Sequence, residues 1–239
     1  MKFVIDTHTH TVSSGHAYST IQEMAREAAV NGIRILAVTD HGPVMAGAPC
    51  LFHFGNMKVI PRELYGVRII KGVEANIIDY DGNTDMPHEY LRKLEFAIAS
   101  LHDVCIGPSS VEDHTNAIIN VLRNPYIDAV AHPGNPQFQV DIERVVSAAK
   151  ENGKLIEINN HSFKVRTGSR ENCRQFALLC KKNGVSIVCG SDAHISFDVG
   201  KFDNVYSLLE EVDMPRELIL NTSIEKFERY LKLRRERGK

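Results

Sequence analysis

Three histidines near the start of the chain are the first residues that could do chemistry. His8, His10 and His16 fall within nine positions, just after the apolar run Phe3–Ile5 and just before a helix-like segment. Imidazole is a common metal ligand, so an H-x-H pair at the end of a strand can hold an ion. Such a pair also flanks ordinary turns and is a weak signal by itself. A metal site therefore requires further ligands from other parts of the chain.

Metal-type ligands follow six of the seven strands that the sequence predicts. Seven of the eleven histidines take these positions, together with one glutamate and one aspartate: His8, His10, His16, His41, Glu74, His102, His132, Asp192 and His194. Imidazole and carboxylate without thiolate suit zinc, manganese or iron better than an iron–sulfur centre. A catalytic zinc typically takes three protein ligands, so nine residues suffice for three divalent metal ions, or for two if some residues only orient others. A single ion would leave most of these histidines without a role.

The strands that must position these ligands are apolar runs rich in β-branched residues. They recur about every thirty residues, the size of one strand–helix unit. Near-continuous apolar runs suit parallel strands that are buried on both faces. The predicted strands are Phe3–Ile5, Ile35–Thr39, Val67–Val73, Glu95–Ser100, Ile127–Ala131, Lys154–Ile158 and Val185–Gly190.

Capping patterns predict helices in the gaps between the strands. Thr20 and Glu23 form a capping-box pattern, and Asp141 opens a segment that Gly153 closes. The segment Arg170–Gly184 repeats this arrangement, with lysines in its last turn. Less clearly marked segments predict further helices at His114–Arg123, Asn204–Val212 and Ile224–Arg237, and a long loop at Pro43–Arg62.

Seven strand–helix repeats without a linker predict a single α/β barrel domain that spans residues 1–239. In a parallel barrel every strand points the same way, so the ligands would gather at the carboxyl face, where such barrels build active sites. Periodicity alone leaves an open, doubly wound sheet as the alternative. The chain has no G-x-G-x-x-G after its first strand and no P-loop motif, which disfavours a nucleotide-binding open sheet.

Composition narrows the function classes. The formal net charge of −2 argues against a general nucleic-acid binder. The only basic cluster, Lys232–Lys239, is interrupted by Glu236 and is interpreted as a solvated helix end. No stretch has the length of a membrane span, and no signal peptide is visible. Five cysteines without a C-x-x-C pair indicate reduced thiols in a cytoplasmic protein.

The remaining polar residues receive more modest predictions. His161 and Arg166 follow the sixth strand on the ligand face, and both are candidates to contact the substrate. Asp6 and Asp40 lie next to ligand histidines and either orient their rings or cap strand ends. Three histidines are expected to lie outside the site, in loops or near a helix start: His53, His88 and His114.

Seven segments between Asp6 and His194 together resemble the signature of one family, the PHP (polymerase and histidinol phosphatase) superfamily. In chain order they are DTHTHTVSSGH, TDHG, GVE, LH, AHPG, EINN and GSDAH. Within that superfamily the chain is most similar to the small, stand-alone YcdX-type phosphatases. The resemblance implies a distorted (β/α)7 TIM-like barrel with a trinuclear metal site, usually occupied by zinc.

The resemblance also implies a role for each of the nine ligand residues, all of which are present. His8, His10, Glu74 and Asp192 would hold the first metal and form the catalytic metal–hydroxide site. Glu74 would bridge to a second metal, which His102 and His132 would also bind. His16, His41 and His194 would hold the third metal.

These expectations converge on a phosphatase that hydrolyses a small phosphorylated metabolite, a phosphomonoester, by attack of a metal-bridging hydroxide. A PHP-type nuclease or phosphodiesterase, a metal-dependent amidohydrolase and a non-catalytic metal-binding module are the alternatives. The acidic net charge disfavours the nuclease, and the strand count with the positions of His16 and His102 disfavours the amidohydrolase. The sequence leaves a homo-oligomer open.

Overall fold

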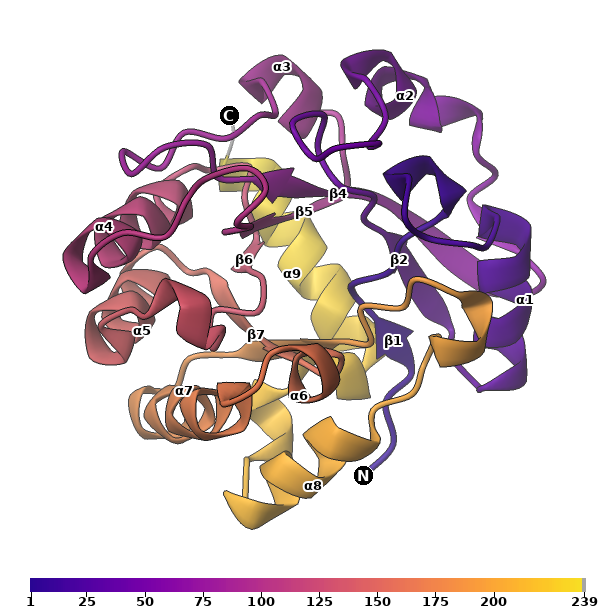
Figure 1. Cartoon of the computed structure of the whole chain (residues 1–239). Helices are drawn as coiled ribbons and strands as arrows, with labels where there is room; N and C mark the ends of the chain where they lie inside the picture. Colours follow the sequence, from indigo (N-terminus) through magenta and orange to yellow (C-terminus); the bar gives the residue numbers. More distant parts are fainter. Residues whose placement is uncertain (238–239) are drawn as a thin grey trace.

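The seven predicted strands form one parallel sheet that curls into a barrel (Figure 1). A computed structural model describes residues 1–237. The strand order is β1-β2-β4-β5-β6-β7-β8, and a short β3 (Glu63–Leu64) pairs antiparallel with the start of β4. The parallel strands are β1 (Ile5–Asp6), β2 (Ile35–Val38), β4 (Val67–Asn76), β5 (Phe96–Ser100), β6 (Ala129–Val130), β7 (Leu155–Asn159) and β8 (Ile187–Gly190).

The barrel closes between β8 and β1 through a side chain instead of a continuous ladder. The Asn221 amide donates to the carbonyl oxygens of Ile5 (2.9 Å) and Cys189 (2.7 Å), and its oxygen accepts from the Cys189 N–H (2.8 Å). Further along, a single parallel bridge joins Thr9 to Ala193. The predicted distorted (β/α)7 barrel is therefore confirmed, and the open, doubly wound sheet is excluded.

Longer helices such as α1, α4, α5 and α7 surround the barrel because each buries one apolar face against the outer side of the sheet (Figure 1). The predicted capping box at Thr20 and Glu23 is present, Asp141 caps its helix, and Gly184 ends another with φ 69°. The helices are α1 (Ile21–Val30), α2 (Leu51–Asn56), α3 (His88–Leu91), α4 (Val111–Leu122), α5 (Ile142–Glu151), α6 (Ser162–Val165), α7 (Ser169–Asn183), α8 (Asp203–Glu211) and α9 (Ile224–Arg237). In the described part of the chain, no helix combines the length and apolarity needed to cross a membrane.

The structure corrects three local predictions. The segment Pro43–Arg62 is not a continuous loop, because it contains α2 and the 3₁₀ turn Met57–Val59, which bury Phe54 and Met57 against the barrel. α4 begins before His114, because the Ser110 hydroxyl accepts a hydrogen bond from the third residue beyond it. β4 continues beyond its predicted end, so Glu74 lies inside a strand.

α9 crosses the end of the barrel where the strands begin (Figure 1). Phe227 and Leu231 on this helix join the apolar residues that fill the barrel interior. The interpretation of the C-terminal basic cluster as a solvated helix end is wrong for Arg234, which is only 5% exposed. Its guanidinium lies 2.7 Å from a carboxylate oxygen of Asp128, which is buried just before β6. A buried carboxylate without a cationic partner would be strongly destabilising, and Arg234 supplies that partner.

Candidate metal centre

All nine predicted ligand residues lie together at the carboxyl ends of the strands. A cavity of about 200 Å³ opens over them, lined by seven of the nine and by His161 and Arg166. His8 and His10 lie deeper and are fully buried. The strands run parallel, so polar residues far apart in the sequence meet at this one face.

Four donor atoms surround one point in the deepest part of the site. His8 Nε2 lies 3.0 Å from His10 Nε2, 3.2 Å from Glu74 Oε2 and 3.5 Å from Asp192 Oδ1. His10 Nε2 lies 3.4 Å and 3.2 Å from the same two oxygens. Zinc bonds of about 2.0–2.1 Å in a tetrahedron place neighbouring donor atoms about 3.3 Å apart. These four residues therefore fit a tetrahedrally coordinated metal ion.

Glu74 also contacts imidazoles through its other oxygen. Its Oε1 lies 2.8 Å from His132 Nε2 and 3.4 Å from His102 Nε2, while its Oε2 lies 2.9 Å from His41 Nδ1. Glu74 Oε2 and His41 Nδ1 are buried and face each other, but their contact does not have hydrogen-bond geometry and neither has another hydrogen-bond partner among the described residues. Leaving buried polar atoms without partners is costly, and a bound cation would satisfy both.

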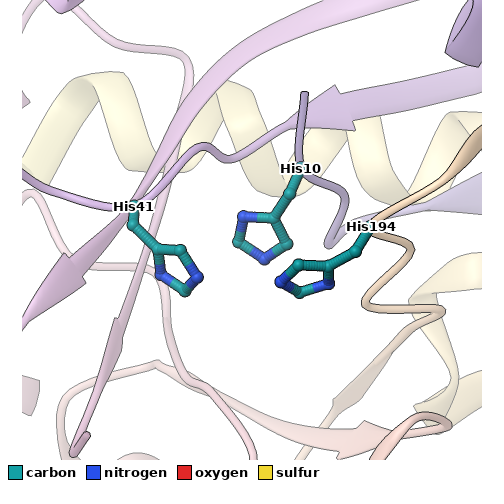
Figure 2. A group of neighbouring side chains, drawn as sticks. All are labelled: His10, His41 and His194. Carbon is teal, nitrogen blue, oxygen red and sulfur yellow. The ribbon is translucent and has the colours of Figure 1, made fainter. Parts of the chain in front are cut away.

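The remaining histidines form a third group next to these. His16 Nε2 and His194 Nε2 lie 3.1 Å apart. Ring nitrogens of His10, His41 and His194 lie within 4.8 Å of one another, and Figure 2 shows the three rings turned toward a shared space. The ring centres of His16 and His41 are 5.0 Å apart. His41 thus lies between this group and Glu74.

Hydrogen bonds at the opposite ring nitrogens hold three of these imidazoles in place. His8 Nδ1 lies 2.7 Å from Glu157 Oε1, and His102 Nδ1 lies 2.9 Å from Asn76 Oδ1. His10 Nδ1 lies 3.2 Å from the hydroxyl of Ser14. Such contacts fix the ring orientation and keep the Nε2 lone pair free for a metal.

Sequence analysis did not find these orienting residues, Glu157, Asn76 and Ser14. Glu157 gave one detectable signal, since it is a charged residue inside the apolar run of a predicted buried strand. Its carboxylate also accepts the backbone N–H of His132 at 2.7 Å. Asn76 and Ser14 carry no charge, and their types are common at strand ends and turns, so the sequence offered no comparable signal.

The two aspartates next to ligand histidines have different roles. Asp40 accepts hydrogen bonds from the Ser14 hydroxyl and the Thr11 N–H, both at 2.7 Å, so it acts on His10 through Ser14. Asp6 instead accepts backbone N–H groups, including that of Ser191 at 3.0 Å, and contacts no imidazole. Burial raises the pKa of Asp6 to about 6.

The three histidines expected outside the site do lie outside it. His114 is buried between the Ser109 N–H and the Gln139 carbonyl, and His88 lies within hydrogen-bond distance of the Asn124 amide. His53 belongs to α2 instead of a loop, and its Nε2 lies 3.6 Å from Asp40.

The electrostatics of the site favour neutral imidazoles and ionised carboxylates. Burial, helped by the nearby His41, lowers the pKa of His10 to about 3, and burial lowers the pKa of His102 well below its ordinary value. Burial opposes the charge on Glu74, but the surrounding imidazoles outweigh it and hold the pKa of Glu74 well below its usual range. Lone pairs and negative charge thus converge at this end of the barrel.

His8 is the exception that shows where a cation is favoured. Burial disfavours a charged His8, but the carboxylates of Glu157, Glu74 and Asp192 outweigh this effect and raise the pKa of His8 well above its ordinary value. A metal ion between these carboxylates supplies the same positive charge and leaves the imidazole neutral.

Backbone conformation at two of the predicted ligands is unusual. His132 (φ 32°) and Asp192 (φ 55°) are two of four non-glycine residues with positive φ in the described part of the chain. This conformation is strained for residues with a Cβ and persists where the surroundings enforce it, often at functional sites.

Comparisons with known proteins agree with this geometry. The family model of the PHP domain matches residues 6–161. A protein of Acetivibrio thermocellus named "Probable phosphatase" is 70% identical over 237 residues, covering 99% of this chain and 98% of its own. A "Probable phosphatase" of Caldanaerobacter subterraneus is 54% identical over 239 residues, covering 99% and 94%. The crystal structure of histidinol phosphate phosphatase from Lactococcus lactis, complexed with zinc, L-histidinol and phosphate, shares the fold at a TM-score of 0.61 and 14% identity, covering 90% and 95%.

Proposed function

The chain belongs to the PHP domain family, and from that premise we propose that it is a metal-dependent phosphatase acting on small phosphomonoesters. The observation that carries the proposal is the set of four donor atoms of His8, His10, Glu74 and Asp192, spaced 3.0–3.5 Å apart as a tetrahedral ion requires. Relatives across nearly the full chain length are named as phosphatases, which supports the reaction type.

Three divalent metal ions, most simply zinc, account for all nine ligands. The first would be held by the four residues just named, and the second by Glu74 with His102 and His132. The third would be held by His16, His41 and His194, supported by the 3.1 Å separation of two of their ring nitrogens. His41 Nδ1 also lies 2.9 Å from Glu74 Oε2, the oxygen of the first set, so it connects the first and third positions.

When bound, such ions supply a water that ionises near neutral pH and positive charge for the phosphate oxygens. Arg166 lines the cavity with its Nη1 3.6 Å from Asp192 Oδ2, and a phosphate entering there would meet its guanidinium. The Ser162 hydroxyl accepts a hydrogen bond from the same nitrogen and holds the side chain over the site. Burial lowers the pKa of His161, which keeps this cavity-lining ring neutral beside the substrate.

The cavity favours a small substrate over a nucleic acid. Its volume of about 200 Å³ accommodates a phosphate group and a few further atoms. Met45 and Val165 are its apolar lining residues, and no tryptophan, tyrosine or phenylalanine lines it for stacking a base.

Two measurements test the proposal. Elemental analysis of protein purified without chelator should find two to three transition-metal ions per chain, and one or none would contradict the polynuclear site. Turnover of an aryl phosphomonoester should exceed that of an aryl phosphodiester and of single-stranded DNA. Preference for the diester or DNA would support the nuclease instead. A fully metal-loaded protein that turns over none of them would be a binding module.

A further inference from the structure

A second concave site lies away from the metal centre and is strongly basic. A cavity of about 530 Å³ is lined by six cationic side chains and a single carboxylate, Glu95. We call it the basic groove, and its cations are Lys58, Arg62, Arg68, Lys71, Lys93 and Arg235. None of these residues lines the metal-centre cavity.

The groove gathers cations from four separate parts of the chain. They come from the segment after α2, from β4, from the segment before β5 and from the last turn of α9. The whole chain has a net charge of −2, so this concentration of positive charge is local and does not follow from composition. Arg235 belongs to the C-terminal basic cluster and does not line the metal-centre cavity.

Most of these cations lack a counter-charge. Arg68 pairs with Glu228 at 2.5 Å and lies 3.7 Å from Glu95. The other five have no carboxylate within 4.0 Å among residues 1–237. The buried Nε of Arg68 also has no hydrogen-bond partner there. Like charges held together repel, and a bound anion would relieve this repulsion while accepting charge-assisted hydrogen bonds.

The size of the groove points to a compact ligand. Its volume lies in the range of about 300–1,000 Å³ that is typical of small-molecule pockets. A cavity of about 550 Å³ adjoins it and shares Lys93, Leu94, Glu95 and Arg235. Apolar atoms of Phe54, Met57 and Leu94 also line the groove, next to the cations.

We propose that the basic groove binds a compact organic polyphosphate at a site independent of the metal centre. Six cationic side chains in one groove offer more hydrogen-bond donors than a single phosphate group accepts, which favours a ligand with several linked phosphates. A nucleic-acid strand is the less suitable occupant, because such sites stack bases on accessible aromatic rings and the groove's phenylalanine, Phe54, is only 3% exposed.

Calorimetric titration of the metal-loaded protein with magnesium-saturated ATP tests this proposal. We expect one ATP per chain, bound with the same Kd by the intact protein and by Asp192→Ala, in which the metal centre is disrupted. The double variant Lys58→Ala/Lys93→Ala should raise the Kd about tenfold or more, because it removes two charge-assisted contacts. The matched control Lys150→Ala/Lys182→Ala removes two exposed lysines from other helices and should leave the Kd unchanged.

Four results would overturn the proposal. The first is no saturable ATP binding by the intact protein. The second is binding that Asp192→Ala abolishes and Lys58→Ala/Lys93→Ala retains, which would locate the ATP at the metal centre. The third is AMP binding as tightly as ATP, and the fourth is a single-stranded oligoribonucleotide that binds the groove more tightly than ATP does. Thermal melts and zinc analysis of each variant separate loss of binding from loss of fold.

Discussion

Each end of the barrel buries a cluster of charged side chains, and among the described residues the two clusters differ in how completely the protein satisfies them: the cluster around Glu74 leaves polar atoms without hydrogen bonds, and the cluster around Asp128 does not. At the carboxyl end, Glu74 Oε2 and His41 Nδ1 lack hydrogen bonds, and several donor atoms converge on one point. At the amino end, the buried Asp128 carboxylate accepts bonds from Arg234, from Tyr230 and from the Ala97 N–H. Burial is the same at both ends, so it does not by itself mark a functional site.

The two buried cations near Asp128 are satisfied just as completely. Arg234 donates to the carbonyl oxygens of Leu94 (2.8 Å) and Tyr126 (3.0 Å) in addition to Asp128. Lys154 donates to two further backbone carbonyls at 2.6 and 2.5 Å. This network closes the barrel, whereas the incomplete bonding at the other end leaves room for ions. The difference predicts that substitutions at the two ends affect different properties of the protein.

The largest expected effect is on turnover. His10→Ala or Asp192→Ala removes one donor of the tetrahedral set, and phosphomonoester turnover should fall by on the order of 10³-fold or more. The midpoint of thermal unfolding without metal, measured on the same variants, separates loss of a metal donor from loss of the fold. His88→Ala, on a histidine outside the site, is the matched control. Near-normal turnover by either ligand variant would refute the ligand assignment.

The amino end should show the opposite pattern. Arg234→Met leaves the Asp128 carboxylate buried without its cation, and we expect the free energy of unfolding to fall by about 3–5 kcal/mol. Turnover per folded, metal-loaded molecule should stay close to that of the intact protein. Urea unfolding measures the first quantity and a phosphomonoester assay the second. Adding Asp128→Asn should restore part of the lost stability, and a further loss would contradict the pairing.

A weaker effect on zinc affinity should follow from a substitution that removes the support of the His8 imidazole but keeps His8 itself. Glu157→Gln keeps the shape of the side chain that contacts His8 Nδ1 but removes its charge. Zinc affinity, measured by competition with a chelating dye, should fall about 10–100-fold, and saturating zinc should recover most of the turnover. Asn160→Asp, on a neighbouring residue whose side chain faces α8, tests for a general effect of charge. Unchanged zinc affinity in Glu157→Gln would mean that this carboxylate does not position the ligand.

The smallest effect concerns pH. Burial lowers the pKa of Lys154 from 10.5 to about 7. Between these values the unfolded chain holds a proton that the folded chain releases, so this residue makes stability rise with pH across that window. Urea unfolding of the intact protein and of Lys154→Met should therefore diverge in slope from pH 7 upward, with the variant flatter. Parallel slopes would show that the paired carbonyls keep the lysine charged.

The sequence located the residues that gather at the carboxyl end better than the residues that support them. Predicted ligands such as His102 and Asp192 follow strand ends directly, so the chain order of strands locates them without knowledge of packing. Predicting the role of Glu157 requires knowing the direction of its side chain relative to the barrel. Predicting the role of Arg234 requires knowing its partner, which lies 106 positions away in the sequence. The short helices α2, α3 and α6 were missed because tertiary packing, not capping or periodicity, stabilises segments of four to six residues.

The bonds that Asn221 makes between β1 and β8 constrain when this part of the barrel can close during folding. The residue joins the first strand to the last, yet it comes after both in the chain and immediately before α9. The Asn221 bonds across the β1–β8 seam can therefore form only after the C-terminal segment has been synthesised, and the same segment carries the helix that fills the barrel's amino end. Closure with this high sequence separation is entropically costly, so we expect barrel closure to be a late step in folding.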